Sequence, residues 1–336
     1  MIRKTIAGII LFASIQGCGL NGVYSTWKNG QIDPAKREEI EVLNNKLINS
    51  IKFNDTVAVK SMMSDTLKKA TGNEIDTVIS RISPAFETDQ FAVLDEYNVH
   101  NLISGISNSL PANKKSDNDY TLNYIALTKE VYVSLLLVKD RTGDILVTVV
   151  YGNYDGKWEI NILQIGRYRF FNKTAMDYYR LAKLNYKKSY FIDAANNLFL
   201  ANDCLKPAGD IFHYKKENEV KAYYDSVVNE IQAKYQLPLT LRNIPGKPQI
   251  FSIYPQVMSG GYFTTVRYLS SINLDDSIAL GKENEKIRIE VQKIFTGISI
   301  NKKATLYQAF NEMPDGEHPI KHYGFVDRGK MQPASF

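Results

Sequence analysis

The sequence predicts an α+β protein, because helix-type and strand-type hydrophobic patterns occupy separate stretches of the chain. Apolar residues recur at three- and four-residue intervals between residues 34 and 86, and they alternate between residues 91 and 167. Helical spacing then returns, and short strand-like runs follow a proline-rich segment that begins near residue 237. We therefore expect three folded regions, at residues 34–170, 171–236 and 237–336.

The first region is expected to begin with a helix. Asp33 is a typical N-cap, and Pro34 suits the first helical position because it has no N–H to satisfy. Helical spacing of apolar residues continues as far as Ile51. Two shorter helices are expected near residues 56–63 and 75–86.

An antiparallel meander is expected to follow these helices. Its five strands span residues 91–99, 120–127, 130–139, 144–152 and 157–167. Helices followed by a meander that closes on Gly156-Lys157-Trp158-Glu159-Ile160 resemble the NTF2-like (cystatin-like) fold. The resemblance covers about residues 35–167. It implies a curved antiparallel sheet wrapped around a helix, with a conical pocket inside.

The second region resembles a single tetratricopeptide-type helical hairpin. The large and small positions of that pattern are occupied by Tyr178, Leu181, Ala182, Ala194, Leu198 and Ala201. Asn185 departs from the pattern, which has an aromatic residue there, and Pro207 comes one position late. A third helix near residues 216–235 is expected to cap the hairpin. Because the sequence has no second repeat, we expect this hairpin to pack on its neighbours and not to form a peptide-binding array.

The third region is predicted to be a small α+β domain with the element order ββαββ. It follows a linker that contains Leu237-Pro238 and residues 244–248. The expected strands span residues 249–257, 262–269, 304–311 and 322–326, and the expected helix spans residues 283–295.

The start of the chain has the pattern of a cleaved export signal. Arg3 and Lys4 precede an apolar run of about 11 residues, which is shorter than the ~20 residues that a helix needs to cross a bilayer. The run ends in Ile15-Gln16-Gly17-Cys18, which resembles the lipobox of bacterial lipoproteins. The resemblance implies a signal peptide at residues 1–17, cleavage before Cys18, and a diacylglyceryl thioether with an acylated (palmitate-type) amine on that residue. The alternative is an ordinary leader that happens to carry a cysteine.

Lipidation implies a place in the cell envelope, most simply the periplasmic side of a Gram-negative outer membrane. The Gly- and Asn-rich residues 18–33 are expected to form the tether. Membrane lipid is then the first partner, through Cys18. A formal charge of +5, with Arg3 and Lys4 in the leader, is too small and too mixed in sign to indicate nucleic-acid binding.

The sequence offers little that indicates catalysis, and we expect no cofactor and no metal. It has no nucleophile elbow, phosphate-binding loop, dinucleotide fingerprint or zinc-protease motif. His318 and His322 are four residues apart, but Pro319 argues against the helix that would bring their rings together. Cys204 is expected to be a buried, inert thiol, with a reactive thiol as the alternative.

A pocket for an apolar ligand is one hypothesis for the predicted cone. Its candidate lining residues are Tyr120, Tyr124, Tyr132, Tyr151, Trp158 and His100. The alternative is that these aromatic residues simply pack on the sheet, since aromatic residues favour strands. The carboxylates of this region fall mostly at predicted turns or strand ends, where we expect them to stay solvated with ordinary pKa values of ~4. They include Asp95, Glu96, Asp140, Asp144 and Asp155.

Two functions remain open at this stage. The first is a non-enzymatic envelope lipoprotein that binds a protein partner or an apolar envelope ligand. The second is an NTF2-like lipoprotein that binds or transforms a small molecule. An apolar plug in the cone would favour the first, and facing carboxylate, His and Tyr side chains inside it would favour the second. The oligomeric state stays open.

Overall fold

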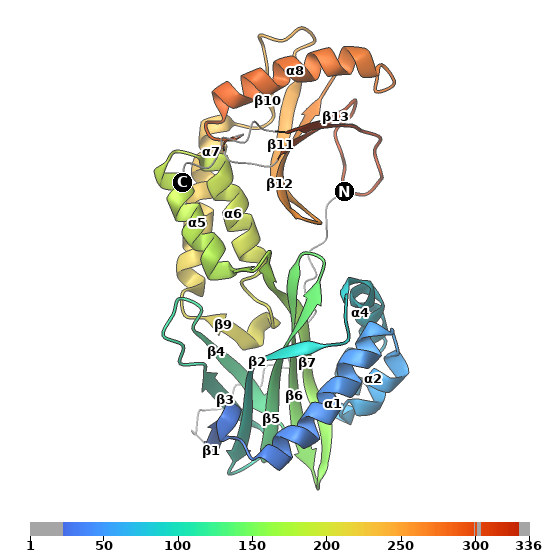
Figure 1. Ribbon diagram of the computed structural model, residues 1–336, viewed down its shortest axis with the longest axis vertical. Coiled ribbons are helices and arrows are strands. Elements are labelled where there is room, and N and C mark those ends of the chain that lie inside the picture. The colour runs from blue at the N-terminus through green and yellow to red at the C-terminus, as the bar shows by residue number, and fades with distance from the viewer. Residues whose placement is uncertain (1–22, 299, 301–303, 329–336) are drawn as a thin grey trace, which may run out of the picture. The chain divides into compact units, whose positions relative to one another are not determined.

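A computed structural model describes residues 23–298, 300 and 304–328 (Figure 1). Within this range the chain forms two compact units. The N-terminal unit contains residues 23–174 and Cys204–Glu217, and the C-terminal unit contains Ala175–Asp203 and residues 218–328. Helices and largely antiparallel sheets make up both units, which confirms the predicted α+β class.

A strongly curled, six-stranded antiparallel sheet forms the centre of the N-terminal unit (Figure 1). Its strands, in spatial order, are β1 (Val23–Lys28), β2 (Phe91–Asn101), β5 (Glu130–Asp140), β6 (Gly143–Tyr154), β7 (Lys157–Phe170) and β8 (Lys173–Thr174). A second sheet contains β3 (Ile106–Pro111), β4 (Tyr120–Ala126) and β9 (Phe212–Tyr214). Asp155 and Gly156 have positive φ angles and form the tight turn between β6 and β7.

Helices cover the concave face of the curled sheet (Figure 1). They are α1 (Pro34–Lys52), α2 (Thr56–Met62), α3 (Asp65–Thr71) and α4 (Glu74–Ile82). The unit also contains short 3-10 turns at Asn29–Gln31, Ser83–Ala85 and Gly209–Ile211. The Asp33 carboxylate accepts a hydrogen bond from the Ala35 N–H at 2.9 Å and caps α1, as expected. The helical spacing of Ile40, Leu47 and Ile51 aligns them on one fully buried face of α1.

Two expectations about this unit are wrong. The predicted strand 120–127 does not join the meander, because β4 pairs with β3 and β9 and contacts neither β2 nor β5 as a ladder partner. Residues 23–28, expected to belong to a tether, form β1, since the β-branched and aromatic side chains of Val-Tyr-Ser-Thr-Trp suit a strand that pairs with β2.

The C-terminal unit combines helices with a five-stranded sheet. Its helices are α5 (Ala175–Lys187), α6 (Phe191–Asp203), α7 (Glu217–Tyr235) and α8 (Ser277–Ile294). The strands, in spatial order, are β10 (Leu239–Thr240), β11 (Gln249–Met258), β12 (Gly261–Leu269), β13 (Thr305–Phe310) and β14 (Tyr323–Asp327). Only β12 and β13 are parallel, and α8 supplies the crossover that a parallel pair requires. The helix begins six residues before its predicted start, because Asp276 caps it by accepting from the Ala279 N–H at 2.9 Å.

None of the described helices is both long and apolar enough to cross a membrane.

Candidate functional site

The space inside the curled sheet is filled by apolar side chains. Leu47, Ile48 and Ile51 of α1 pack against strand residues such as Leu136 and Val147 in one continuous core. Tyr132, Tyr151 and Trp158, three of the candidate pocket residues, belong to this core and are at most 7% exposed. In the described part of the chain, the cone therefore contains an apolar plug where the NTF2-like resemblance implies a pocket.

Tyrosine hydroxyls within this core are paired with polar groups of neighbouring elements. The Tyr151 hydroxyl donates to Asn44 Oδ1 at 3.0 Å, and Asn44 Nδ2 donates to Ser134 Oγ at 3.1 Å. The Tyr132 hydroxyl donates to Glu96 Oε2 at 2.7 Å. Burial raises the pKa of Tyr151, and burial together with the Glu96 hydrogen bond raises the pKa of Tyr132. Both phenols therefore stay protonated at neutral pH and act as hydrogen-bond donors.

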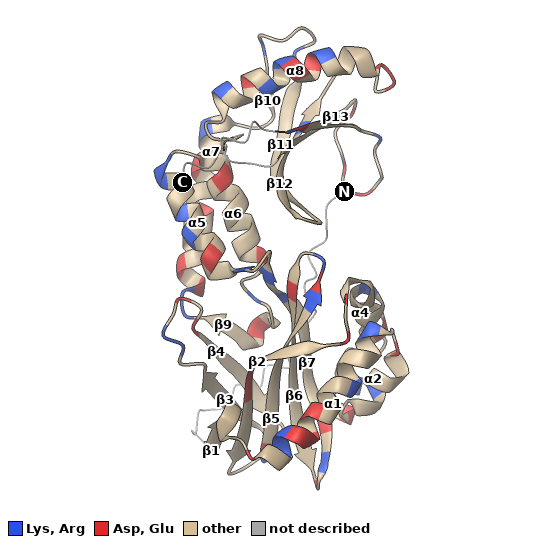
Figure 2. Cartoon of the chain, viewed as in Figure 1, with Lys and Arg blue, Asp and Glu red and all other residues tan. Residues whose placement is uncertain are grey.

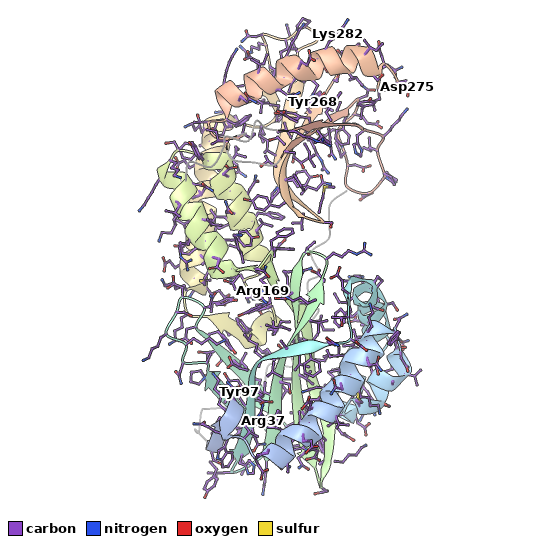
Figure 3. All side chains as sticks on the ribbon, in the orientation of Figure 1. Arg37, Tyr97, Arg169, Tyr268, Asp275 and Lys282 are labelled. Atoms are coloured by element: carbon purple, nitrogen blue, oxygen red, sulfur yellow. The ribbon has the colours of Figure 1, made fainter. Side chains whose placement is uncertain are left out.

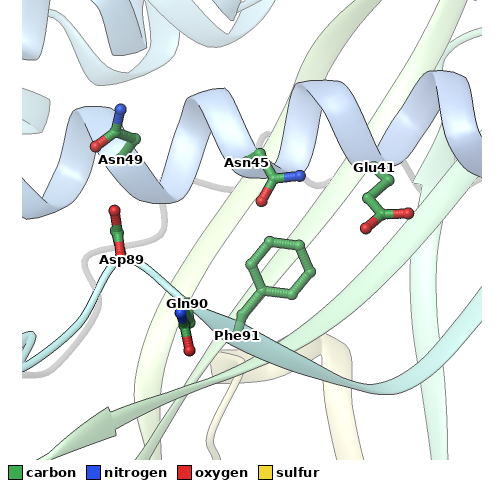
Figure 4. A pocket seen from close by; sticks show the side chains of 6 residues that line it. All are labelled: Glu41, Asn45, Asn49, Asp89, Gln90 and Phe91. Carbon is green, nitrogen blue, oxygen red and sulfur yellow. The ribbon is translucent and has the colours of Figure 1, made fainter.

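An open groove runs between α1 and the beginning of β2. It consists of two adjoining hollows of about 450 and 500 Å³, which share Glu41 and Phe91. The first is lined by Glu41, Asn45, Asn49, Asp89, Gln90 and Phe91, whose side chains Figure 4 shows. The second is lined by Pro34, Arg37, Glu38, Glu41, Asn44, Phe91, Val93 and Glu96. Carboxylates and amides supply five of the six side chains around the first hollow and four of the eight around the second, so the groove is polar with an excess of negative charge.

The floor of the groove holds an ion pair. Arg37 on α1 donates through Nε to Glu96 Oε1 at 2.5 Å, and the Glu96 side chain is only 7% exposed. Figure 3 labels Arg37 near the start of α1, and Figure 2 shows charges of both signs along that helix. The Glu96 carboxylate thus bridges an arginine at the surface and the buried hydroxyl of Tyr132.

One side of the groove is an open sheet edge. Strand β1 pairs only with residues 97–101 of β2, so it leaves the preceding half of β2 uncovered. The Asn29 side chain closes the last part of that half, because its Oδ1 accepts from the Glu96 N–H at 2.8 Å and its Nδ2 donates to Asp95 at 3.0 Å. Residues 91–93 pair with β5 on one side, and the register shifts at Leu94. On the other side, residues 91–94 pair with no described strand. Val93 in this segment is 45% exposed.

The other two candidate tyrosines lie apart from this groove, in the three-stranded sheet. Tyr120 donates to Asp95 Oδ2 at 2.5 Å, and Tyr124 accepts from Asn108 Nδ2 at 3.2 Å. Burial is the main cause that raises the pKa of each phenol. The structure therefore separates the six candidate residues into different places and does not gather them around one cavity.

His100, the remaining candidate, sits at the far end of β2. Its Nε2 lies 3.4 Å from Glu130 Oε1, and its ring makes an edge-to-face contact with Trp27. His213 bridges Glu217 and the Asp210 carbonyl, and His318 contacts Asp315. Within the described ranges, no three His, Cys, Asp or Glu side chains lie close enough to hold a metal ion.

The expectation that the carboxylates of this region stay solvated is wrong for four of them. Asp95, Glu96, Asp140 and Asp144 are buried at their side chains, at most 7% exposed. Each of the four is paired with a lysine or an arginine. The position of a carboxylate along a predicted strand therefore does not show whether its side chain is buried. A buried carboxylate needs a paired cation, and these cations come from other parts of the chain.

Of the two cysteines, one lies within the described residues. Cys204 is fully buried. Cys18, the predicted lipidation site, lies outside the described residues.

Comparison with protein-family models, with curated proteins and with solved structures finds no match to this chain.

Proposed function

We propose that this protein is an envelope lipoprotein that binds a protein partner through the open edge of its curled sheet. In this proposal, lipid on Cys18 holds the chain to the membrane, on the periplasmic side of a Gram-negative outer membrane. The N-terminal unit is an NTF2-like scaffold, and α5 with α6 is a tetratricopeptide-like hairpin that stiffens the C-terminal unit.

The observation that carries the binding proposal is the uncovered segment of β2 at residues 91–94. An exposed edge presents backbone N–H and C=O groups, and an extended segment of another protein can pair with them as an added strand. Val93 and Phe91 supply apolar contacts at this edge, while natural edges are usually protected by charge, proline or a covering loop.

The groove beside the edge indicates the chemistry of the partner. Glu38, Glu41 and Asp89 are exposed carboxylates along it, and Glu96 is already neutralised by Arg37. A partner strand with lysine or arginine side chains on the groove side would place cations against these carboxylates. Such complementarity contributes mostly to the association rate and to specificity.

The second candidate function, small-molecule binding or turnover, is supported by the Glu96–Tyr132 contact. This pair brings a carboxylate and a phenol together on the concave face, as a catalytic NTF2-like site would require. The packed core and the Arg37 ion pair weigh against it, because they leave Glu96 engaged and Tyr132 without room for a substrate. If this function is correct, Tyr132→Phe should abolish ligand retention while Val93→Lys leaves it intact.

The experiment is affinity capture with lipidated protein from detergent-solubilised envelopes, in wild-type form and in two variants. Val93→Lys places a charge on the open edge, and Val57→Lys places the same charge on α2, where Val57 is 77% exposed. A partner that binds the edge should be lost from Val93→Lys, by about tenfold or more, and retained by Val57→Lys. Equal capture by both variants would refute the edge as the binding site.

A further inference from the structure

Exposed apolar side chains gather at one end of the N-terminal unit. Val23 and Tyr24 at the start of β1 are 37% and 76% exposed, and Leu102 and Ile103 in the β2–β3 connection are 60% and 55% exposed. Val23 is paired with Asn101, so β1 begins beside the residues that lead into that connection. We call these four residues the apolar rim.

The rim is held in place by backbone hydrogen bonds on both sides of the connection. The Asn101 N–H donates to the Lys129 carbonyl and the Gly105 N–H donates to the Ala126 carbonyl, both at 2.7 Å. Leu102 and Ile103 are therefore presented to solvent by a segment that is fixed at each end. Exposed contiguous apolar side chains of this kind mark a surface that contacts another apolar phase or molecule.

The length of chain before the rim identifies what it contacts. Only five residue steps separate Cys18 from Val23, and an extended chain advances at most about 3.6 Å per residue, or about 18 Å in all. If Cys18 is lipidated, its acyl chains hold it at the membrane surface, and the rim cannot lie farther from it than this reach allows. The inference thus rests on the lipid anchor of the proposed function.

We propose that the apolar rim seats on the lipid bilayer and orients the N-terminal unit against the membrane. The side chains fit such a place, since tyrosine favours the membrane–water interface and leucine and isoleucine enter the acyl boundary. Trp27, four residues along the same strand, is 38% exposed and adds a second interfacial aromatic residue. Lys129, exposed beside Asn101, adds a cation that attracts anionic headgroups.

The test uses full-length lipidated protein in vesicles of phosphatidylethanolamine and phosphatidylglycerol. Ile103→Cys is labelled with an environment-sensitive fluorophore, and Val57→Cys carries the same label as a matched exposed position. Cys204 is buried and stays unlabelled in the native protein. Spin-labelled lipids should quench the label at 103 about threefold or more beyond the label at 57, because a seated rim enters the interface by ~5–10 Å. Tyr24→Cys gives a second rim position if the first variant folds poorly.

Three outcomes would overturn the proposal or its premise, and they are distinguishable. If the labelled protein does not float with the vesicles, the lipid anchor itself has failed. If it floats and both labels are quenched equally, the anchor stands and the rim does not touch lipid. If the label at 103 is shielded in native envelopes but not in pure lipid vesicles, a protein covers the rim in place of the bilayer.

Discussion

The hydroxyl of Tyr120 donates a 2.5 Å hydrogen bond to the carboxylate of Asp95, and this bond joins the two sheets of the N-terminal unit. Asp95 lies on β2 of the curled sheet and Tyr120 on β4 of the smaller one. Lys28 and Lys114 each approach the same carboxylate to 3.1 Å. The ring of Tyr120 also stacks on Phe212 of β9, the neighbouring strand of the smaller sheet, so the phenol that reaches Asp95 is held in place within its own sheet.

We expect Asp95→Asn to destabilise the N-terminal unit by about 1–3 kcal/mol, because it removes a buried anion and leaves two lysines without their shared partner. Both tryptophans of the chain, Trp27 and Trp158, lie in this unit, so urea unfolding followed by tryptophan fluorescence reports on it. Asp155→Asn, in the exposed β6–β7 turn, is the matched control and should change the free energy of unfolding by less than about 0.5 kcal/mol. Equal effects of the two variants would show that the Asp95 cluster contributes little.

The same residue should make stability depend on pH in the acid range. Burial acts to raise the pKa of Asp95, but hydrogen bonds from Tyr120, Asn29 and Lys28 and the charge of Lys114 outweigh it and hold the pKa below its usual range. A lowered pKa in the folded state means that the stabilisation is present above the unfolded pKa, near ~4, and is lost as the pH falls through the folded value. Between pH 6 and pH 3 the wild type should therefore lose more stability than Asp95→Asn. Parallel pH profiles for the two proteins would contradict this assignment.

The fold class could be predicted because local pattern and element type agree over long stretches of this chain. The face of α1 that carries Ile40, Leu47 and Ile51 and the alternating strands β5 and β6 are set by spacing alone. The partners of β4 could not be predicted in this way, since alternation fixes the faces of a strand and not its neighbour. β9, which completes the smaller sheet, follows β4 by more than 80 residues.

The candidate site could be predicted less well than the fold class, because it also depends on which elements become neighbours. The side chains of Tyr132, Tyr151 and Trp158 pack on the helical side of the sheet, but the side chains of α1 fill the space that a ligand would need. The open edge at residues 91–94 depends on where β1 stops pairing, which is a tertiary property.

A close approach of two backbone segments supplies the next prediction. A Cβ atom added to Gly166 on β7 would lie 2.5 Å from the carbonyl oxygen of Pro207 and 3.0 Å from its carbonyl carbon. Since backbone atoms cannot move aside at little cost, Gly166→Ala should destabilise the unit by about 1–3 kcal/mol. Gly30→Ala, where the added atom meets nothing within 4 Å, is the control and should be close to neutral. The tryptophan-monitored urea midpoint measures both, and an unchanged midpoint for Gly166→Ala would mean that the Pro207 segment packs less closely than described.

The lipid anchor leads to a prediction about fractionation. Cys18→Ser should move the protein from the membrane fraction to the soluble fraction, because serine cannot form the thioether and several acyl chains hold a protein far more firmly than contacts at its surface. Cys204→Ala removes the other cysteine and should leave the protein with the membranes. The measurement is sedimentation of envelopes after a high-salt wash. Retention of the serine variant under those conditions would exclude lipid on Cys18 as the anchor.

A buried glutamate in the C-terminal unit should affect stability in the opposite pH direction from Asp95. Glu283 on α8 is 5% exposed, and its Oε2 accepts from Ser270 Oγ at 2.6 Å while Oε1 has no hydrogen-bond partner among the described residues. Burial raises the pKa of Glu283, and the Ser270 hydrogen bond opposes this only in part. A folded-state pKa above the unfolded value means that this group's contribution is present below the unfolded pKa, near ~4.3, and is lost as the pH rises through the folded value.

At neutral pH the unit therefore carries the cost of a buried anion, which Glu283→Gln removes. The variant should be more stable than the wild type at pH 8, by about 1 kcal/mol, and the difference should shrink towards pH 4. Urea unfolding followed by far-ultraviolet circular dichroism at both pH values measures it. Glu285→Gln, on an exposed position of the same helix, makes the same chemical change without burial and should leave the two midpoints unaltered. If Glu283→Gln is the less stable protein at pH 8, the carboxylate is better satisfied in its charged form than the geometry around Oε1 indicates.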